Sequence, residues 1–69
     1  MSVEERMTVN LTRRGRTGLA SAMEATGDTK TEVVNRALEL YGRVIGRTAQ
    51  GDDLLLRTSA GELTQLLLF

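Results

Sequence analysis

Apolar and polar residues alternate strictly along residues 7–12, which read Met-Thr-Val-Asn-Leu-Thr. A period of two is the signal of a half-buried strand, because successive side chains point to opposite faces. The apolar face of this predicted strand carries Met7, Val9 and Leu11. The polar face carries Arg6, Thr8, Asn10 and Thr12.

The pattern then changes to a helical period, and two helices are predicted. Thr12 suits the N-cap of a helix over residues 13–26, and Gly27 stands where a helix C-terminal glycine belongs. The second helix opens with a capping box, in which Thr29 and Glu32 serve each other's backbone amides. It is expected to end between residues 46 and 50, before Gly51. Its apolar stripe consists of Val33, Val34, Ala37, Leu38, Tyr41, Val44 and Ile45.

The last third of the chain has another pattern. Two short apolar runs, residues 54–58 and 63–69, flank the turn-like sequence Ser59-Ala60-Gly61-Glu62. Two such runs around a turn that contains glycine predict a β-hairpin. Leucine is an indifferent strand former, so a short amphipathic helix is the alternative prediction.

The size of the chain makes self-association necessary. A domain of 69 residues buries too little surface for a robust core and usually needs disulfides, a metal or oligomerisation. The sequence has no Cys and no His, which excludes disulfides and the usual zinc ligands. The strand over residues 7–12 also lacks a neighbour to pair with before the helices. We therefore expect it to pair with the same strand of a second copy, in a homodimer with a shared core.

Charge and side-chain chemistry add a candidate ligand. The net charge is zero, yet residues 6–16 contain four Arg and no acid. A two-stranded antiparallel ribbon fits the major groove of B-DNA, where Asn can bind adenine and Thr can bond several bases. The start of the second helix offers backbone amides and Lys30 to a phosphate. Each feature also has an ordinary interpretation, namely a solvated strand face, a capped helix start and solubilising arginines.

The order and spacing of these elements resemble a known family. Residues 6–12, the Gly27-Asp28-Thr29-Lys30-Thr31 connection and the stretch from Ala37 to Tyr41 are similar to the ribbon-helix-helix superfamily, above all to CopG-like plasmid repressors and more distantly to Arc and MetJ. The resemblance covers residues 6–47. It implies an α+β fold, an intertwined homodimer with an N-terminal ribbon, and binding of the ribbon in the major groove. The expected organisation is a flexible N-terminus (1–5), a ribbon-helix-helix DNA-binding domain (6–50) and an apolar C-terminal extension (51–69).

The resemblance also assigns candidate site residues. The base-reading positions correspond to Thr8, Asn10 and Thr12, with Arg6 at the margin. The phosphate-binding positions correspond to Thr29, Lys30 and Thr31, and the Arg13 and Arg14 side chains are added as candidate phosphate contacts. The sequence departs from the family at three points: its reading positions are uncharged, Gly15 and Gly18 loosen the first helix, and Asp28 is an acid beside the expected phosphate.

Other function classes are less well supported. There is no glycine-rich phosphate loop and no paired-histidine motif, and the acidic pair Asp52-Asp53 suits a solvated loop, so neither an enzyme nor a cofactor or metal is expected. No run of residues is long and apolar enough for a membrane span, and we expect a cytoplasmic repressor that binds double-stranded DNA as a dimer or a dimer of dimers. The alternatives are an antitoxin whose tail binds a toxin, and an assembly module without DNA binding. The apolar tail favours packing on the protein's own dimer over a toxin partner.

Overall fold

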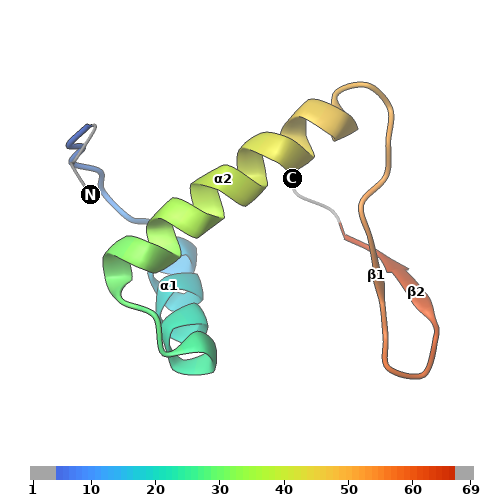
Figure 1. The fold of residues 1–69 in the computed structure, drawn as a ribbon, viewed down its shortest axis with the longest axis horizontal. Helices are drawn as coiled ribbons and strands as arrows, with labels where there is room; N and C mark the ends of the chain where they lie inside the picture. Colours follow the sequence, from blue (N-terminus) through green and yellow to red (C-terminus); the bar gives the residue numbers. More distant parts are fainter. Residues whose placement is uncertain (1–4, 67–69) are drawn as a thin grey trace. The chain divides into compact units, whose positions relative to one another are not determined.

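The computed structural model describes residues 5–66, which form a small α+β fold of two helices followed by a two-stranded antiparallel sheet (Figure 1). The helices are α1 (Arg13–Thr26) and α2 (Lys30–Thr48), and the strands are β1 (Leu55–Arg57) and β2 (Leu63–Gln65). The chain divides into two units between Val34 and Asn35, inside α2. The first unit holds α1 with the start of α2, and the second holds the remainder of α2 with the hairpin.

Local capping chemistry sets both ends of α1, as predicted. The Thr12 hydroxyl accepts a hydrogen bond from the Gly15 backbone N–H at 3.0 Å, which satisfies one of the amides that a helix start leaves without a partner. At the other end Gly27 has φ 75° and donates its N–H to the Met23 carbonyl at 2.8 Å. A left-handed residue in this position costs glycine nothing, so the helix stops there.

The predicted capping box at the start of α2 is confirmed. The Thr29 N–H donates to Glu32 Oε1 at 2.9 Å, and the Glu32 N–H donates to Thr29 Oγ1 at 3.2 Å. The helix ends at Thr48, within the predicted interval, and Gly51 follows with φ 97°. Just beyond the end, Arg47 Nε donates to Asp52 Oδ2 at 2.6 Å, an ion pair that ties the last turn to the loop after the helix.

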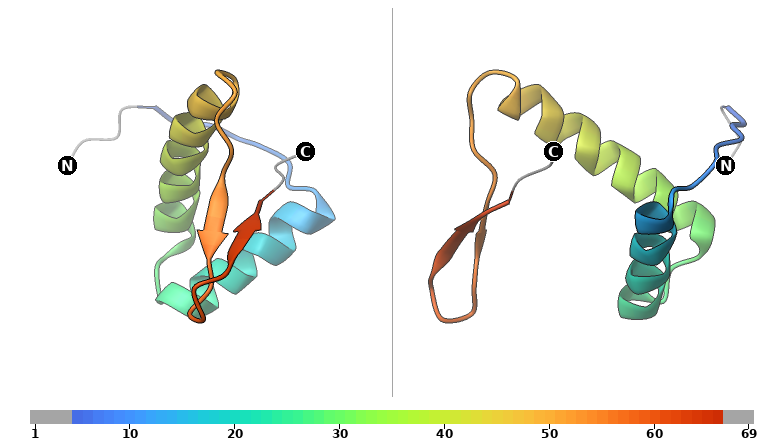
Figure 2. Two further views of the ribbon diagram at one scale, coloured as in Figure 1. Left: turned by 90° about the vertical axis from the view of Figure 1, so that its right-hand side faces the viewer. Right: turned by 180° about the vertical axis from the view of Figure 1, so that it is seen from behind.

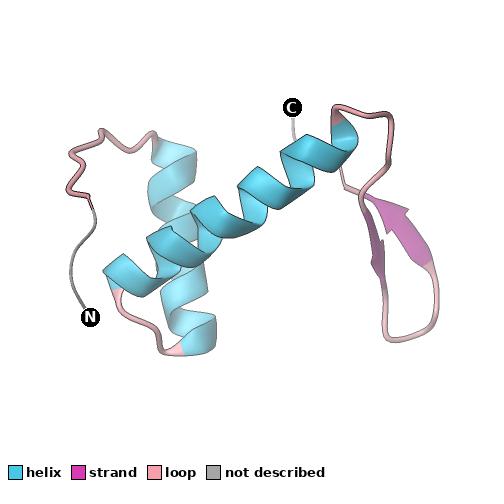
Figure 3. Ribbon diagram, turned by 45° about the horizontal axis from the view of Figure 1, so that its top comes forward, coloured by secondary structure: helices cyan, strands magenta, loops and turns pink. Residues whose placement is uncertain are grey.

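The C-terminal extension forms the predicted β-hairpin and not the alternative helix (Figure 3). Leu55 pairs with Gln65, Leu56 with Thr64, and Arg57 with Leu63. The Gly61 N–H donates to the Thr58 carbonyl at 2.9 Å, and Gly61 has φ 88°. This is the geometry of a three-residue hairpin loop that ends in a left-handed glycine. Residues 67–69 of the predicted second run lie outside the described residues.

The predicted N-terminal strand is not present within a single chain. Residues 5–12 form neither a helix nor a strand, and all of them are exposed. The physical reason is that a strand exists only through its hydrogen-bonded neighbour, and the sheet of this chain contains only β1 and β2 among the described residues. Within the described part of the single chain, residues 6–12 therefore have no strand to pair with.

No residue within 5–66 is buried. The predicted apolar stripes are visible only as partial burial, which in the helices covers Leu19, Ala22, Met23, Val33, Val34, Val44 and Ile45. The stripe of α2 also leaves Leu38 and Tyr41 exposed, together with Leu40 at its edge. None of the described helices is long and apolar enough to cross a membrane. One chain thus presents its apolar faces to the outside instead of enclosing a core.

Candidate nucleic-acid interface

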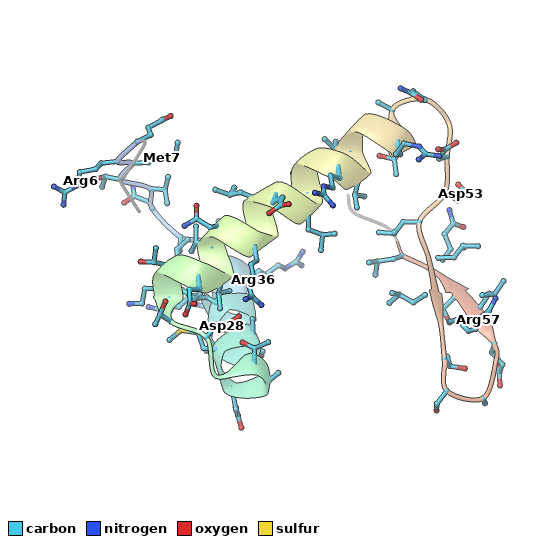
Figure 4. The ribbon with its side chains drawn as sticks, viewed as in Figure 1. Arg6, Met7, Asp28, Arg36, Asp53 and Arg57 are labelled. Atoms are coloured by element: carbon cyan, nitrogen blue, oxygen red, sulfur yellow. The ribbon has the colours of Figure 1, made fainter. Side chains whose placement is uncertain are left out.

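The segment before α1 carries three exposed apolar side chains. Met7 is 69% exposed, Val9 59% and Leu11 49%, and the polar residues between them are exposed as well. Figure 4 labels Arg6 and Met7 on this segment. Apolar side chains gain about 25 cal/mol for every Å² removed from water, so this segment has a strong tendency to find a partner surface.

Thr12 belongs both to this segment and to the cap of α1. Its hydroxyl oxygen accepts from Gly15, and its carbonyl accepts from the Arg16 N–H at 2.9 Å. A hydroxyl that accepts one hydrogen bond can still donate its own proton. Thr12 can therefore contact a base only through its hydroxyl proton and its methyl group. Thr8 and Asn10 do not cap the helix and are not limited in this way.

The first turn of α1 concentrates positive charge. Arg13, Arg14 and Arg16 are all exposed, and the turn contains no acid. The N-terminus of a helix already carries about half a positive charge, so cations there are unfavourable unless an anion is close. The amides of Arg13 and Arg14 also precede the intrahelical hydrogen bonds. The side chains and backbone amides of Arg13 and Arg14 are thus the candidate phosphate contacts of this turn.

Gly15 gives the cap the room it needs. A Cβ at this position would lie 3.3 Å from Thr12 Oγ1 and 4.0 Å from the Leu11 side chain. The first distance is tighter than an ordinary van der Waals contact, so a larger residue would press on the capping hydroxyl. The glycine that weakens the helix in the sequence therefore has a local steric reason.

The start of α2, the second predicted phosphate site, has acids beside it, as the sequence predicts. The Thr29 amide and hydroxyl are both engaged with Glu32. Lys30 and Thr31 are exposed, as expected of contact residues, but two acids, Asp28 and Glu32, lie within two residues of Lys30. Carboxylates beside the site oppose a phosphate, so the three phosphate-binding candidates of α2 depend mainly on Lys30 and the helix dipole.

One chain brings together only part of the predicted site. Residues Arg6, Thr8, Asn10, Thr12, Arg13 and Arg14 are continuous along the chain and exposed. Thr29, Lys30 and Thr31 follow α1, a helix of 14 residues that is about 21 Å long. Thr12 was predicted both to cap the first helix and to read bases; the cap is confirmed, and base reading stays a prediction. Sequence reasoning left Leu40 out of the α2 stripe, although Leu40 lies seven residues after Val33.

Within residues 5–66, no group of three or more acidic, His or Cys side chains could hold a metal ion. Comparison of the chain with protein-family models, curated protein sequences and solved structures gives no match.

Proposed function

We propose that the protein is a homodimeric, sequence-specific regulator that binds double-stranded DNA. In this proposal residues 6–12 of two copies pair as an antiparallel ribbon and enter the major groove. The observation that carries it is the exposed alternating segment at residues 6–12, joined directly to a helix turn with three arginines and no acid. The resemblance to the ribbon-helix-helix superfamily supports the same arrangement.

The exposed apolar side chains of each unit support a dimer. In the first unit, Met7 is 69% exposed, Val9 59% and Leu11 49%. In the second unit, Leu38 is 60% exposed, Leu40 63% and Tyr41 46%. The ribbon segment and α2 thus supply apolar side chains for an interface with a second copy.

The two faces of the ribbon have separate tasks in this proposal. Met7, Val9 and Leu11 of both copies cover the shared helical core. Thr8 and Asn10 face the bases, where Asn10 can make a bidentate contact to adenine N6 and N7. Arg13 and Arg14 contact the phosphates beside the ribbon and fix its register, with Lys30 as a further contact. Arg6 lies at the margin of the ribbon.

Selection of bound sequences from random duplex DNA, with the full chain, tests the proposal. We expect one enriched site, and Asn10→Ala should cost ~1–3 kcal/mol on that site while binding to a scrambled duplex changes little. An equal loss on both duplexes would make Asn10 structural. The slope of log K against log salt should be near −0.9 for each phosphate neutralised, with about 4–8 phosphates involved. The absence of an enriched site and of a salt response would favour an assembly module without DNA binding.

A further inference from the structure

The C-terminal hairpin has leucines on both of its faces. Paired residues of antiparallel strands share a face, so Leu55, Arg57, Leu63 and Gln65 form one face. The Leu66 N–H donates to the Leu54 carbonyl at 2.8 Å, so the same pairing register continues to these two leucines. The other face of the hairpin therefore consists of Leu54, Leu56, Thr64 and Leu66. Leu55 is 48% exposed, Leu56 54% and Leu63 58%. A two-stranded hairpin is marginal in water, and this one has no buried face to support it.

The hydrogen-bond register defines which backbone groups point outward. Two backbone hydrogen bonds identify the hydrogen-bonded pairs. One joins Leu66 to Leu54, and the other runs from the Thr58 N–H to the Glu62 carbonyl at 2.7 Å. Such pairs alternate with non-hydrogen-bonded ones. The Leu55–Gln65 and Arg57–Leu63 pairs are therefore the non-hydrogen-bonded pairs, and their backbone groups point away from the hairpin. Each strand presents the N–H and C=O groups of two residues at its outer edge, and no third strand lies beside either of them within the described part of the chain (Figure 2).

The two outer edges differ in charge. The β1 edge carries Arg57, labelled in Figure 4, whereas β2 reads Leu-Thr-Gln and has no charged residue. Proteins usually protect edge strands with charged residues, proline or a bulge. The chain contains no proline, and β2 has no charge to prevent pairing. The edge of β2 is therefore an unprotected template for another strand.

We propose that the hairpin is a second self-association surface, at which β2 pairs antiparallel with β2 of another copy about Thr64. In this register Leu63 faces Gln65 of the other copy, and the outward backbone groups of both residues are satisfied in both chains. The two Thr64 side chains meet at the centre, and Thr–Thr pairs are favourable across strands. The product is a four-stranded sheet with two rows of leucines.

The opposite edge is the poorer choice because of Arg57. Pairing of β1 with β1 about Leu56 would place Leu55 opposite Arg57 of the other copy. The two Arg57 side chains would then be diagonal neighbours on one face, about 7–8 Å apart at the backbone, and would repel each other. Pairing through β2 keeps the two arginines on the outer strands of the sheet. The hairpin surface is separate in the sequence from residues 6–12 and does not depend on DNA binding.

Single cysteines test the pairing, because the protein has none of its own. In the proposed register the two Thr64 residues form a non-hydrogen-bonded pair with Cα atoms about 4.5 Å apart, within disulfide range. The two Leu56 residues are then three strand spacings apart, roughly 14 Å. We expect full-length Thr64→Cys to form a disulfide-linked dimer at least tenfold faster than Leu56→Cys and Ser59→Cys, the last being a collision control in the turn. Faster linkage through Leu56→Cys, or equal slow rates at all three positions, would overturn the proposal.

Two leucines on the same face provide a matched pair for a second measurement. In the Thr64→Cys background, Leu63→Lys introduces a charge at the β2 edge and should slow disulfide formation at least tenfold. Leu55→Lys introduces the same charge on the same face but at the β1 edge, and should leave the rate within about twofold. Equal effects of the two lysines would contradict pairing through β2. Neither result depends on whether residues 6–12 bind DNA.

Discussion

The Thr12 hydroxyl accepts the backbone N–H of Gly15 at 3.0 Å, and this bond connects the end of the proposed ribbon to the first turn of α1. The residue that closes the ribbon is thus also the cap of the helix that carries the arginines. Its geometry fixes the direction in which the chain enters α1. A substitution at Thr12 can therefore affect folding and DNA binding separately, depending on which atoms it removes.

We expect Thr12→Ala to lower the free energy of unfolding by about 1 kcal/mol, because the alanine side chain has no capping acceptor. Thr12→Ser keeps the hydroxyl and should remain within a few tenths of a kcal/mol of the parent protein. Urea denaturation of the three proteins at one concentration measures the difference. Equal stabilities of the alanine and serine variants would show that the cap contributes nothing.

An aspartate substitution should have different effects at the two adjacent residues Val9 and Thr8. Val9→Asp places a carboxylate in the shared core, where an unpaired charge is strongly unfavourable, so sedimentation equilibrium should give a lower mass than for the parent protein because the ribbon interface is lost. Thr8→Asp places the same charge on the groove face and should keep the mass of the parent protein. It should nevertheless lose more than roughly tenfold in DNA affinity by repulsion from the phosphates.

The reverse pattern, dissociation by Thr8→Asp and a stable assembly with Val9→Asp, would mean that the two faces of the ribbon are exchanged. Identical behaviour of both variants would mean that residues 6–12 do not form a two-faced strand. Fluorescence anisotropy of a labelled duplex and sedimentation on the same samples separate these cases.

Arg13 should contribute affinity without sequence preference. Arg13→Ala is expected to weaken binding equally on the selected and scrambled duplexes. It should also reduce the salt slope by about 0.9 for each phosphate that is no longer neutralised, roughly 1.8 for a dimer. Arg43→Ala is the matched control, because Arg43 lies in α2 and its guanidinium pairs with Glu39 Oε1 at 2.8 Å. A slope unchanged by Arg13→Ala, or reduced equally by both variants, would contradict the assignment of α1 as the phosphate-binding element.

Lys30 should also contribute DNA affinity without sequence preference, but less than Arg13 does. Asp28 and Glu32 lie within two residues of it, so the positive field at the start of α2 is partly cancelled. We expect Lys30→Ala to reduce the salt slope by less than Arg13→Ala does, measured on the same duplex over the same range of salt. A larger reduction for Lys30→Ala would make the start of α2 the principal phosphate site.

The ends of the helices and the turn of the hairpin were predictable because local chemistry determines them. Thr12, the Thr29–Glu32 pair, Gly27 and Gly61 each act through backbone groups within a few residues, and a single sequence contains all of that information. The two strands, Leu55–Arg57 and Leu63–Gln65, lie within the apolar runs that predicted them. A strand over residues 7–12 was predicted from its alternation alone. The single chain has no strand there, since the proposed hydrogen-bond partner belongs to another molecule.

In the proposed dimer, residues 6–12 of two copies lie edge to edge with their polar side outward. Isotope-filtered NMR on a mixture of labelled and unlabelled full-length chains can detect this pairing. We predict intermolecular Hα–Hα contacts within residues 6–12, with Val9 and Leu11 near the apolar residues of α2 and Thr8 and Asn10 in solvent. A segment without intermolecular contacts, or one with Thr8 and Asn10 covered by the C-terminal hairpin, would contradict it.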